Sequence, residues 1–251
     1  MAGAGTAVAE PGAVSTALLH IGRDSADERV LAEHICLACI AGLDIDGASM
    51  SLLTATVARE TLWASDVTAN LLEELQFSLG EGPCMQAATT GLVVMVSDLV
   101  HGVNRDSWPA FAAAVIERTG VRALFVVPLR WGVIHLGVLD LYRCAPGDLS
   151  PEQCRDLIAA ADIAALLMLE LRTEPYEADG QGDSCAPWLD SSLGSHAGIH
   201  QATGMVLNQL GIDATEALAR LRAYAFSHQQ LLLDVAADVV ACRLIFTEEM
   251  R

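Results

Sequence analysis

The sequence predicts an α+β domain over residues 24–172, followed by a small all-α domain over residues 193–251. Three observations support this prediction. Helical and strand-like hydrophobic spacing alternate through the first region, an acidic stretch rich in proline and glycine follows over 173–192, and only helical spacing continues beyond it. Residues 1–23 are rich in small side chains without a pattern, so we expect them to be disordered.

The first domain is expected to begin with a helix capped by Asp24 or Ser25, followed by short strands and helices. Apolar residues at intervals of three and four indicate the helices, and short runs of strand character separate them. Before the central strands, the predicted elements are a helix over 24–43, strands over 48–54 and 60–65, helices over 67–77 and 84–89, a strand over 92–97 and a helix over 108–119.

Two strong strands, over 123–129 and 134–142, are separated by four residues and predict a hairpin. A long helix should follow, with Ser150 as its cap and Pro151 at its first position, and should end near Arg172. An antiparallel sheet with flanking helices is the fold that this order of elements favours.

The run Phe77-Ser-Leu-Gly-Glu-Gly-Pro-Cys84, the strand Val126–Leu129 and the segment Gly137–Leu139 carry a family resemblance. Together they resemble a GAF domain, and the resemblance covers residues 24–172. GAF domains bind small molecules or mediate dimers, so the resemblance implies a sensor with an unknown small-molecule ligand. The sequence has no GxxxxGK[ST] loop for a nucleotide phosphate, and therefore does not identify that ligand.

Some residues of this domain have two interpretations. Cys84, at a predicted helix start, is a possible redox or nitrosative sensor or a buried residue of a family-typical turn. Asp140 either points outward from its strand or lines a ligand pocket. His34, Cys36 and Cys39 are interpreted as helix residues with two core thiols, because His34 points away from the cysteines. We expect no metal, no cofactor and no catalytic site, since no G-x-S-x-G or H-E-x-x-H motif occurs.

The last region is predicted to form three helices. The first runs from Ser195 to Leu210 and stops at Gly211. Asp213 caps the second, which ends near His228, and the third covers about 231–247. None of these helices would be stable alone, but a three-helix bundle buries all three apolar stripes.

The segment Ile199–Val206, then Glu216–Leu218 with Leu221, Arg222 and Ala225, then Asp234–Ala236 resemble an ANTAR domain in order and spacing. The resemblance implies an RNA-binding transcription antiterminator that holds paired stem-loops as a dimer. On this basis the candidate RNA-binding residues are His200, Gln201, Thr203, Gly204, Arg222 and Ala225.

Each candidate has a plainer alternative. Gly204 permits close approach either of the RNA backbone or of another helix, and Arg222 contacts a phosphate or pairs with an acid such as Glu216. His200, Gln201 and Thr203 could be ordinary surface. Many ANTAR domains carry lysine where this chain has Thr203, and often a basic residue in the turn at 229–230, where it has two glutamines. These departures predict weak RNA binding or its loss.

Charge limits the possible partners. The chain carries a net charge of −18, and residues 193–251, with six acidic and four basic residues, are its least acidic part in net charge. A nucleic-acid coat and an anionic membrane surface are disfavoured. We expect a cytoplasmic homodimer without a membrane segment, in which the apolar helix ending near Arg172 contributes to the interface. Two alternatives stay open: a DNA-binding factor, disfavoured by a last helix with few basic residues, and a ligand- or thiol-based sensor acting on protein partners.

Overall fold

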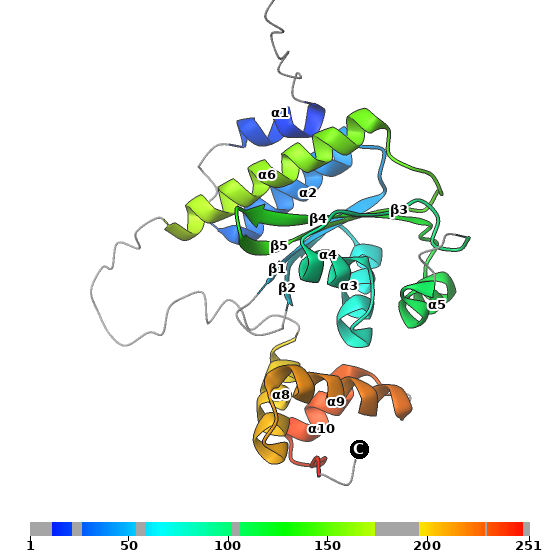
Figure 1. Cartoon of the computed structure of the whole chain (residues 1–251), viewed down its shortest axis with the longest axis vertical. Coiled ribbons are helices and arrows are strands. Elements are labelled where there is room, and N and C mark those ends of the chain that lie inside the picture. Colours follow the sequence, from blue (N-terminus) through cyan, green and yellow to red (C-terminus); the bar gives the residue numbers. More distant parts are fainter. Residues whose placement is uncertain are drawn as a thin grey trace, which may run out of the picture.

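The computed structural model describes residues 12–21, 27–53, 59–101, 106–173, 196–228 and 230–247. A mixed sheet-and-helix domain is followed by a helical one (Figure 1). The elements of the first domain are α1 (Ala13–His20), α2 (Glu28–Gly42), β1 (Gly47–Leu53), β2 (Arg59–Ala64), α3 (Val67–Leu79), α4 (Pro83–Thr90), β3 (Val94–Val96), α5 (Pro109–Arg118), β4 (Ala123–Trp131), β5 (Ile134–Arg143) and α6 (Pro151–Thr173). The second domain contains α8 (Ala197–Leu210), α9 (Ala214–Ser227) and α10 (Leu232–Val240).

The five strands form one antiparallel sheet in the order β2-β1-β5-β4-β3. Helices α1, α2 and α6 cover one face, and α3 and α4 cover the other (Figure 1). Side chains alternate between these layers, as the strand period requires: Phe125 and Leu139 pack toward α2 and α6, whereas Leu124 and Val138 pack toward α3 and α4. Both faces of the sheet are therefore buried.

Local sequence signals set several element ends as expected, but Asp27, and not Asp24 or Ser25, caps α2 by accepting a hydrogen bond from the backbone amide of Arg29. Ser150 accepts a hydrogen bond from the Gln153 amide at the start of α6, and the Asp213 carboxylate caps α9 through the Glu216 amide. Gly211, with a positive φ of 65°, ends α8. The last helix is shorter than predicted and ends at Val240, because the chain leaves the helical conformation at Ala241 and Cys242 has a φ of 56°.

The N-terminal segment corrects one expectation. Residues 13–20 were expected to be disordered, but they form α1, whose Val14 and Leu18 are fully buried. The cap of this helix comes from a distant residue: Asp156 on α6 accepts hydrogen bonds from the amides of Val14 and Ser15 at 2.9 and 3.0 Å. The predicted linker over 173–192 lies, apart from Thr173 at the end of α6, outside the described residues.

Candidate functional site

The segment from Gly80 to Cys84 is shaped by two glycines. Gly80, at a φ of +66°, ends α3, and Pro83 occupies the first turn of α4. Gly82 has a φ of +127°, and a Cβ there would lie 2.6 Å from the Gln76 side chain, so the backbone conformation in particular favours glycine. Between Gly80 and Gly82, the Glu81 carboxylate accepts hydrogen bonds from the backbone amides of Ala110 and Phe111 at the start of α5. The motif therefore joins α3, α4 and α5 at one corner of the domain.

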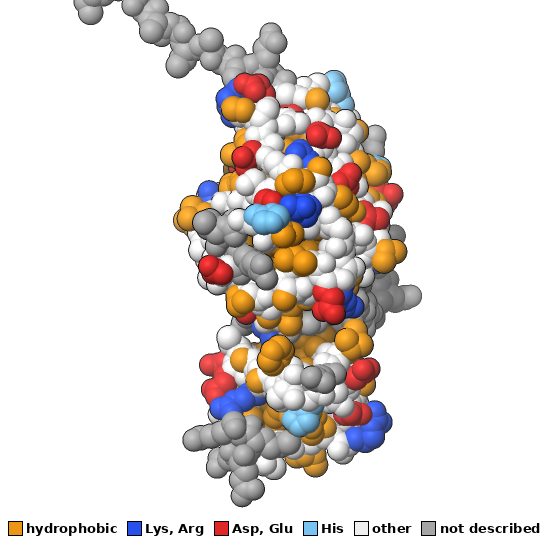
Figure 2. All heavy atoms as spheres, turned by 90° about the vertical axis from the view of Figure 1, so that its right-hand side faces the viewer, with side chains coloured by type: hydrophobic (Ala, Val, Ile, Leu, Met, Phe, Trp, Pro, Cys, Tyr) orange, Lys and Arg blue, Asp and Glu red, His pale blue; other side chains and the backbone are white. Residues whose placement is uncertain are grey.

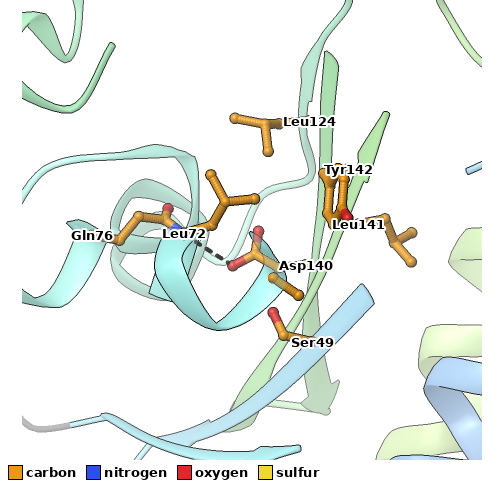
Figure 3. A pocket seen from close by; sticks show the side chains of 8 residues that line it. Ser49, Leu72, Gln76, Leu124, Asp140, Leu141 and Tyr142 are labelled. Atoms are coloured by element: carbon orange, nitrogen blue, oxygen red, sulfur yellow. Dashed lines mark hydrogen bonds between the residues drawn. The ribbon is translucent and has the colours of Figure 1, made fainter. Parts of the chain in front are cut away.

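A very small pocket, lined by both polar and apolar side chains, lies between α3 and the sheet (Figure 3). Gln76 on α3 donates a hydrogen bond to Asp140 on β5 at 3.2 Å, and its carbonyl oxygen accepts one from the Cys84 amide at 2.7 Å. The lining side chains are Ser49, Ala69, Leu72, Gln76, Leu124, Asp140, Leu141 and Tyr142. Asp140 is only 6% exposed, so it faces the pocket instead of solvent.

A second buried carboxyl group lies close to this pocket. Glu73 on α3 is 2% exposed, and its two oxygens accept hydrogen bonds from Ser49 and Ser51 of β1 at 2.8 and 2.9 Å. The strand period places both serines on the same face of β1, toward α3. The polar cluster therefore pairs two buried carboxyl groups with hydroxyl and amide donors of the protein itself.

The ligand atoms of Glu73, Cys84 and Asp140 all lie within 4.8 Å of one another. Two oxygens and one sulfur at this spacing could hold a divalent transition metal. Sequence reasoning named Cys84 as a possible sensor but missed this group, because its members come from α3, α4 and β5. Cys84 itself is completely buried, beside these two carboxyl groups.

Cys36 and Cys39 are core thiols, as the sequence predicted, while His34 on the same helix is exposed. Burial raises the pKa of Cys39 to about 12 and raises that of Cys36 well above its usual value. Both thiols therefore stay protonated at neutral pH. They lie in the core, whereas His34 lies on the exposed side of the helix.

The six candidate RNA-binding residues fall into three groups. Gln201 and Gly204 are exposed on α8, and no described atom from another element lies within 4 Å of the position that a Cβ on Gly204 would take, so packing against another described helix of the same chain does not explain this glycine. Thr203 and Ala225 are buried, and the Thr203 hydroxyl donates to the Ile199 carbonyl at 2.7 Å. Their side chains therefore support the helices instead of facing a ligand.

His200 and Arg222 form the third group, because both contact the first domain. The His200 ring meets the Phe77 ring edge-on at a centroid distance of 6.2 Å, and Arg222 Nε donates to the Phe77 carbonyl at 2.9 Å. Burial, together with the neighbouring His196, lowers the pKa of His200. These two candidates therefore lie at a domain boundary, a position that the sequence did not predict.

Two other arginines of the helical domain pair with acidic side chains. Arg220 pairs with Glu216 at 3.0 Å, and Arg243 pairs with Asp238 at 2.7 Å. On the face shown in Figure 2, acidic and basic side chains of the lower, helical domain are interspersed, without a broad basic surface. Electrostatic attraction to RNA on this face is consequently modest.

The comparisons with known proteins agree with this architecture. The GAF domain profile matches residues 27–168, more than half of the chain, so the chain belongs to the GAF domain family. The ANTAR domain profile matches residues 189–240, which makes the chain a GAF and ANTAR domain-containing protein. A comparison with curated proteins gave no match.

Solved structures resemble the first domain. The GAF domain of a phosphoenolpyruvate-protein phosphotransferase from Coxiella burnetii is 10% identical with a TM-score of 0.51, over 63% of this chain and 92% of that one. A type II free methionine-R-sulfoxide reductase from Thermoplasma acidophilum is 19% identical with a TM-score of 0.43, over 58% of this chain and 97% of that one. At such identities the likeness concerns the fold alone. None of the described helices combines the length and apolar character that crossing a bilayer requires.

Proposed function

We propose that this chain is a transcription antitermination regulator, in which the ANTAR domain binds RNA hairpins and the GAF domain senses a small ligand. The observation that carries the proposal is the ANTAR match over residues 189–240, combined with the exposed face of α8 that presents Gln201 and Gly204. A glycine with open space above it lets a nucleic-acid backbone approach the helix closely.

Unstacked bases in RNA loops expose hydrogen-bonding edges that side chains on such a surface can contact. Sequence-specific RNA recognition targets unstacked nucleotides in loops, whereas duplex DNA is read by a helix that presents several polar side chains to the major groove. The third helix, α10, carries two acidic residues, Asp234 and Asp238, and no basic one. Hairpin RNA therefore suits this domain better than duplex DNA.

The sensor role rests on the polar cluster between α3 and the sheet. The buried carboxyl groups of Glu73 and Asp140 favour a small ligand with donor groups or positive charge, which would replace the serine and glutamine side chains that these groups bind in the described structure. On the opposite face of the domain, Ile158 and Leu166 of α6 are 42% and 36% exposed, and we propose that they pack against a second copy of the chain. A regulatory role without catalysis is consistent with both matched domain types.

The test is a binding titration of the full chain against paired-hairpin RNA and duplex DNA at increasing salt. Gln201→Glu adds a negative charge to the exposed face of α8 and should weaken hairpin binding about five- to tenfold, since each phosphate contact contributes to the salt-dependent affinity. Ala237→Glu adds the same charge to an exposed position on α10 and serves as the control. Equal affinity for both nucleic acids, or no hairpin binding at low salt, would contradict the proposal.

A sensor that acts on protein partners is the second candidate. It is favoured by the pairing of Arg220 and Arg243 with acids and by threonine at position 203. The same titration separates the two functions, because this alternative predicts that hairpin binding is weak or lost in the unmodified chain and in every variant.

A further inference from the structure

The two domains are joined by the C-terminal end of α3. Phe77, near the end of this GAF helix, is 2% exposed and belongs to the hydrophobic core of the helical domain. Its ring stacks on His196 at a centroid distance of 4.0 Å and an interplanar angle of 17°. Phe77 is absent from the two hydrophobic cores of the GAF domain itself, so its burial depends on the contact between domains.

Polar contacts surround this aromatic residue. Arg222 Nε donates to the Phe77 carbonyl at 2.9 Å, and the guanidinium carbon lies 5.3 Å from the centre of the Phe77 ring. Arg222 thus satisfies a carbonyl in the last turn of α3, where the helix leaves acceptors free and its dipole favours a cation. One turn earlier, the Glu74 carboxylate lies 3.2 Å from His196 Nε2.

The contact between the domains includes two of the candidate RNA-binding residues. His200 and Arg222, two of the candidate RNA-binding residues, contact Phe77, and a phosphate that bound the Arg222 guanidinium would meet the ring and carbonyl already there. We propose that the end of α3 and hairpin RNA compete for this face of the helical domain, so that the described structure is the RNA-excluding state. This inference rests on the proposed function and describes how the GAF domain would regulate RNA binding.

The same helix also lines the small pocket beside the sheet. Glu73 and Gln76 point into the polar cluster, while their sequence neighbours Glu74 and Phe77 contact the helical domain. A rotation or shift of α3 that improves the pocket contacts of a ligand necessarily moves the docking residues. A ligand can change RNA binding in this way to the extent that it prefers one position of α3 over the other.

The experiment compares hairpin affinity of the full chain with that of Phe77→Ala and Glu74→Gln. Phe77→Ala removes the docked ring and leaves the GAF cores intact, and Glu74→Gln removes only the charge facing His196. If the docked state predominates by ten to one, Phe77→Ala tightens RNA binding about tenfold, and Glu74→Gln acts in the same direction with a smaller effect. Val67→Ala, on the same helix and 85% exposed, should bind like the unmodified chain.

Hydrogen–deuterium exchange of α8 and α9 reports docking independently of RNA. Faster exchange around residues 196–200 and 218–222 in Phe77→Ala, together with tighter binding, supports the competition. Equal or weaker binding in both Phe77→Ala and Glu74→Gln, with helical circular dichroism retained, overturns it while leaving the proposed function in place. Absence of RNA binding in every variant at low salt overturns the proposed function and the competition together.

Discussion

Asp156→Ala should weaken the attachment of α1 to the GAF domain, because Asp156 supplies the cap that this helix lacks in its own sequence. The N-cap residue Gly12 offers no side chain, and the Asp156 carboxylate, 8% exposed, accepts hydrogen bonds from two backbone amides and from the Ser15 hydroxyl. Alanine leaves these buried donors without that acceptor.

The magnitude follows from these bonds. A hydrogen bond to a charged group contributes about 1.5–3 kcal/mol, and a buried donor left unsatisfied costs about 1–3 kcal/mol. Because the three donors share one carboxylate, the effects are not additive, and we expect a loss of about 3 kcal/mol in the free energy of unfolding. Burial of Val14 and Leu18, at about 1.5–3 kcal/mol each, opposes complete release of the helix.

Urea denaturation followed by circular dichroism measures the loss, and hydrogen exchange of the α1 amides locates it. Asp162→Ala, at an exposed position of the same helix, should change stability by less than about 0.5 kcal/mol. Asp156→Asn keeps one acceptor oxygen, so its loss in the free energy of unfolding should lie between those of Asp156→Ala and Asp162→Ala. If Asp156→Ala and Asp162→Ala have the same free energy of unfolding, the capping explanation is wrong.

Three further predictions concern the pocket, the thiols and the dimer. Glu73→Ala should destabilise the chain by about 2–4 kcal/mol and abolish ligand-induced shifts in melting temperature, whereas Glu73→Gln should cost less, since it keeps the side-chain volume and one acceptor. Cys39 should resist thiol reagents until unfolding, while exposed Cys144 reacts. Because the folded pKa of Cys39 is raised from 9.0 to about 12, the unfolded chain binds fewer protons in this range, and stability should fall as pH rises from 9 toward 12 in urea melts. Leu166→Glu should yield monomers in sedimentation at concentrations where the unmodified chain dimerises, and an unchanged dimer would exclude α6 as the interface.

Locally encoded features of the fold could be predicted from the sequence. Pro83, Ser150, Gly211 and Asp213 mark element ends through their own backbone or side-chain chemistry, and the structure places those ends as expected. Helix α1 could not be predicted, since its cap lies 142 residues away on α6.

The site was harder to predict for the same reason. Ser49, Ser51 and Asp140 alternate with apolar residues, which reads as a strand with one polar, solvent-facing side. Here helices cover both faces of the sheet, so these polar residues are buried against α3. Thr203 and Ala225 were assigned to RNA by position within a motif, but side-chain direction depends on the packing of the bundle, and both point inward.

The position of Glu73 beside Glu74 on α3 has a thermodynamic consequence. Two binding events that act on one helix are linked, and the factor by which a pocket ligand changes hairpin affinity equals the factor by which hairpins change ligand affinity. Under the proposed competition, the amount of target transcript in the cell sets the ligand concentration at which the sensor responds. Abundant transcripts and scarce ones would then be regulated at different thresholds by one and the same chain.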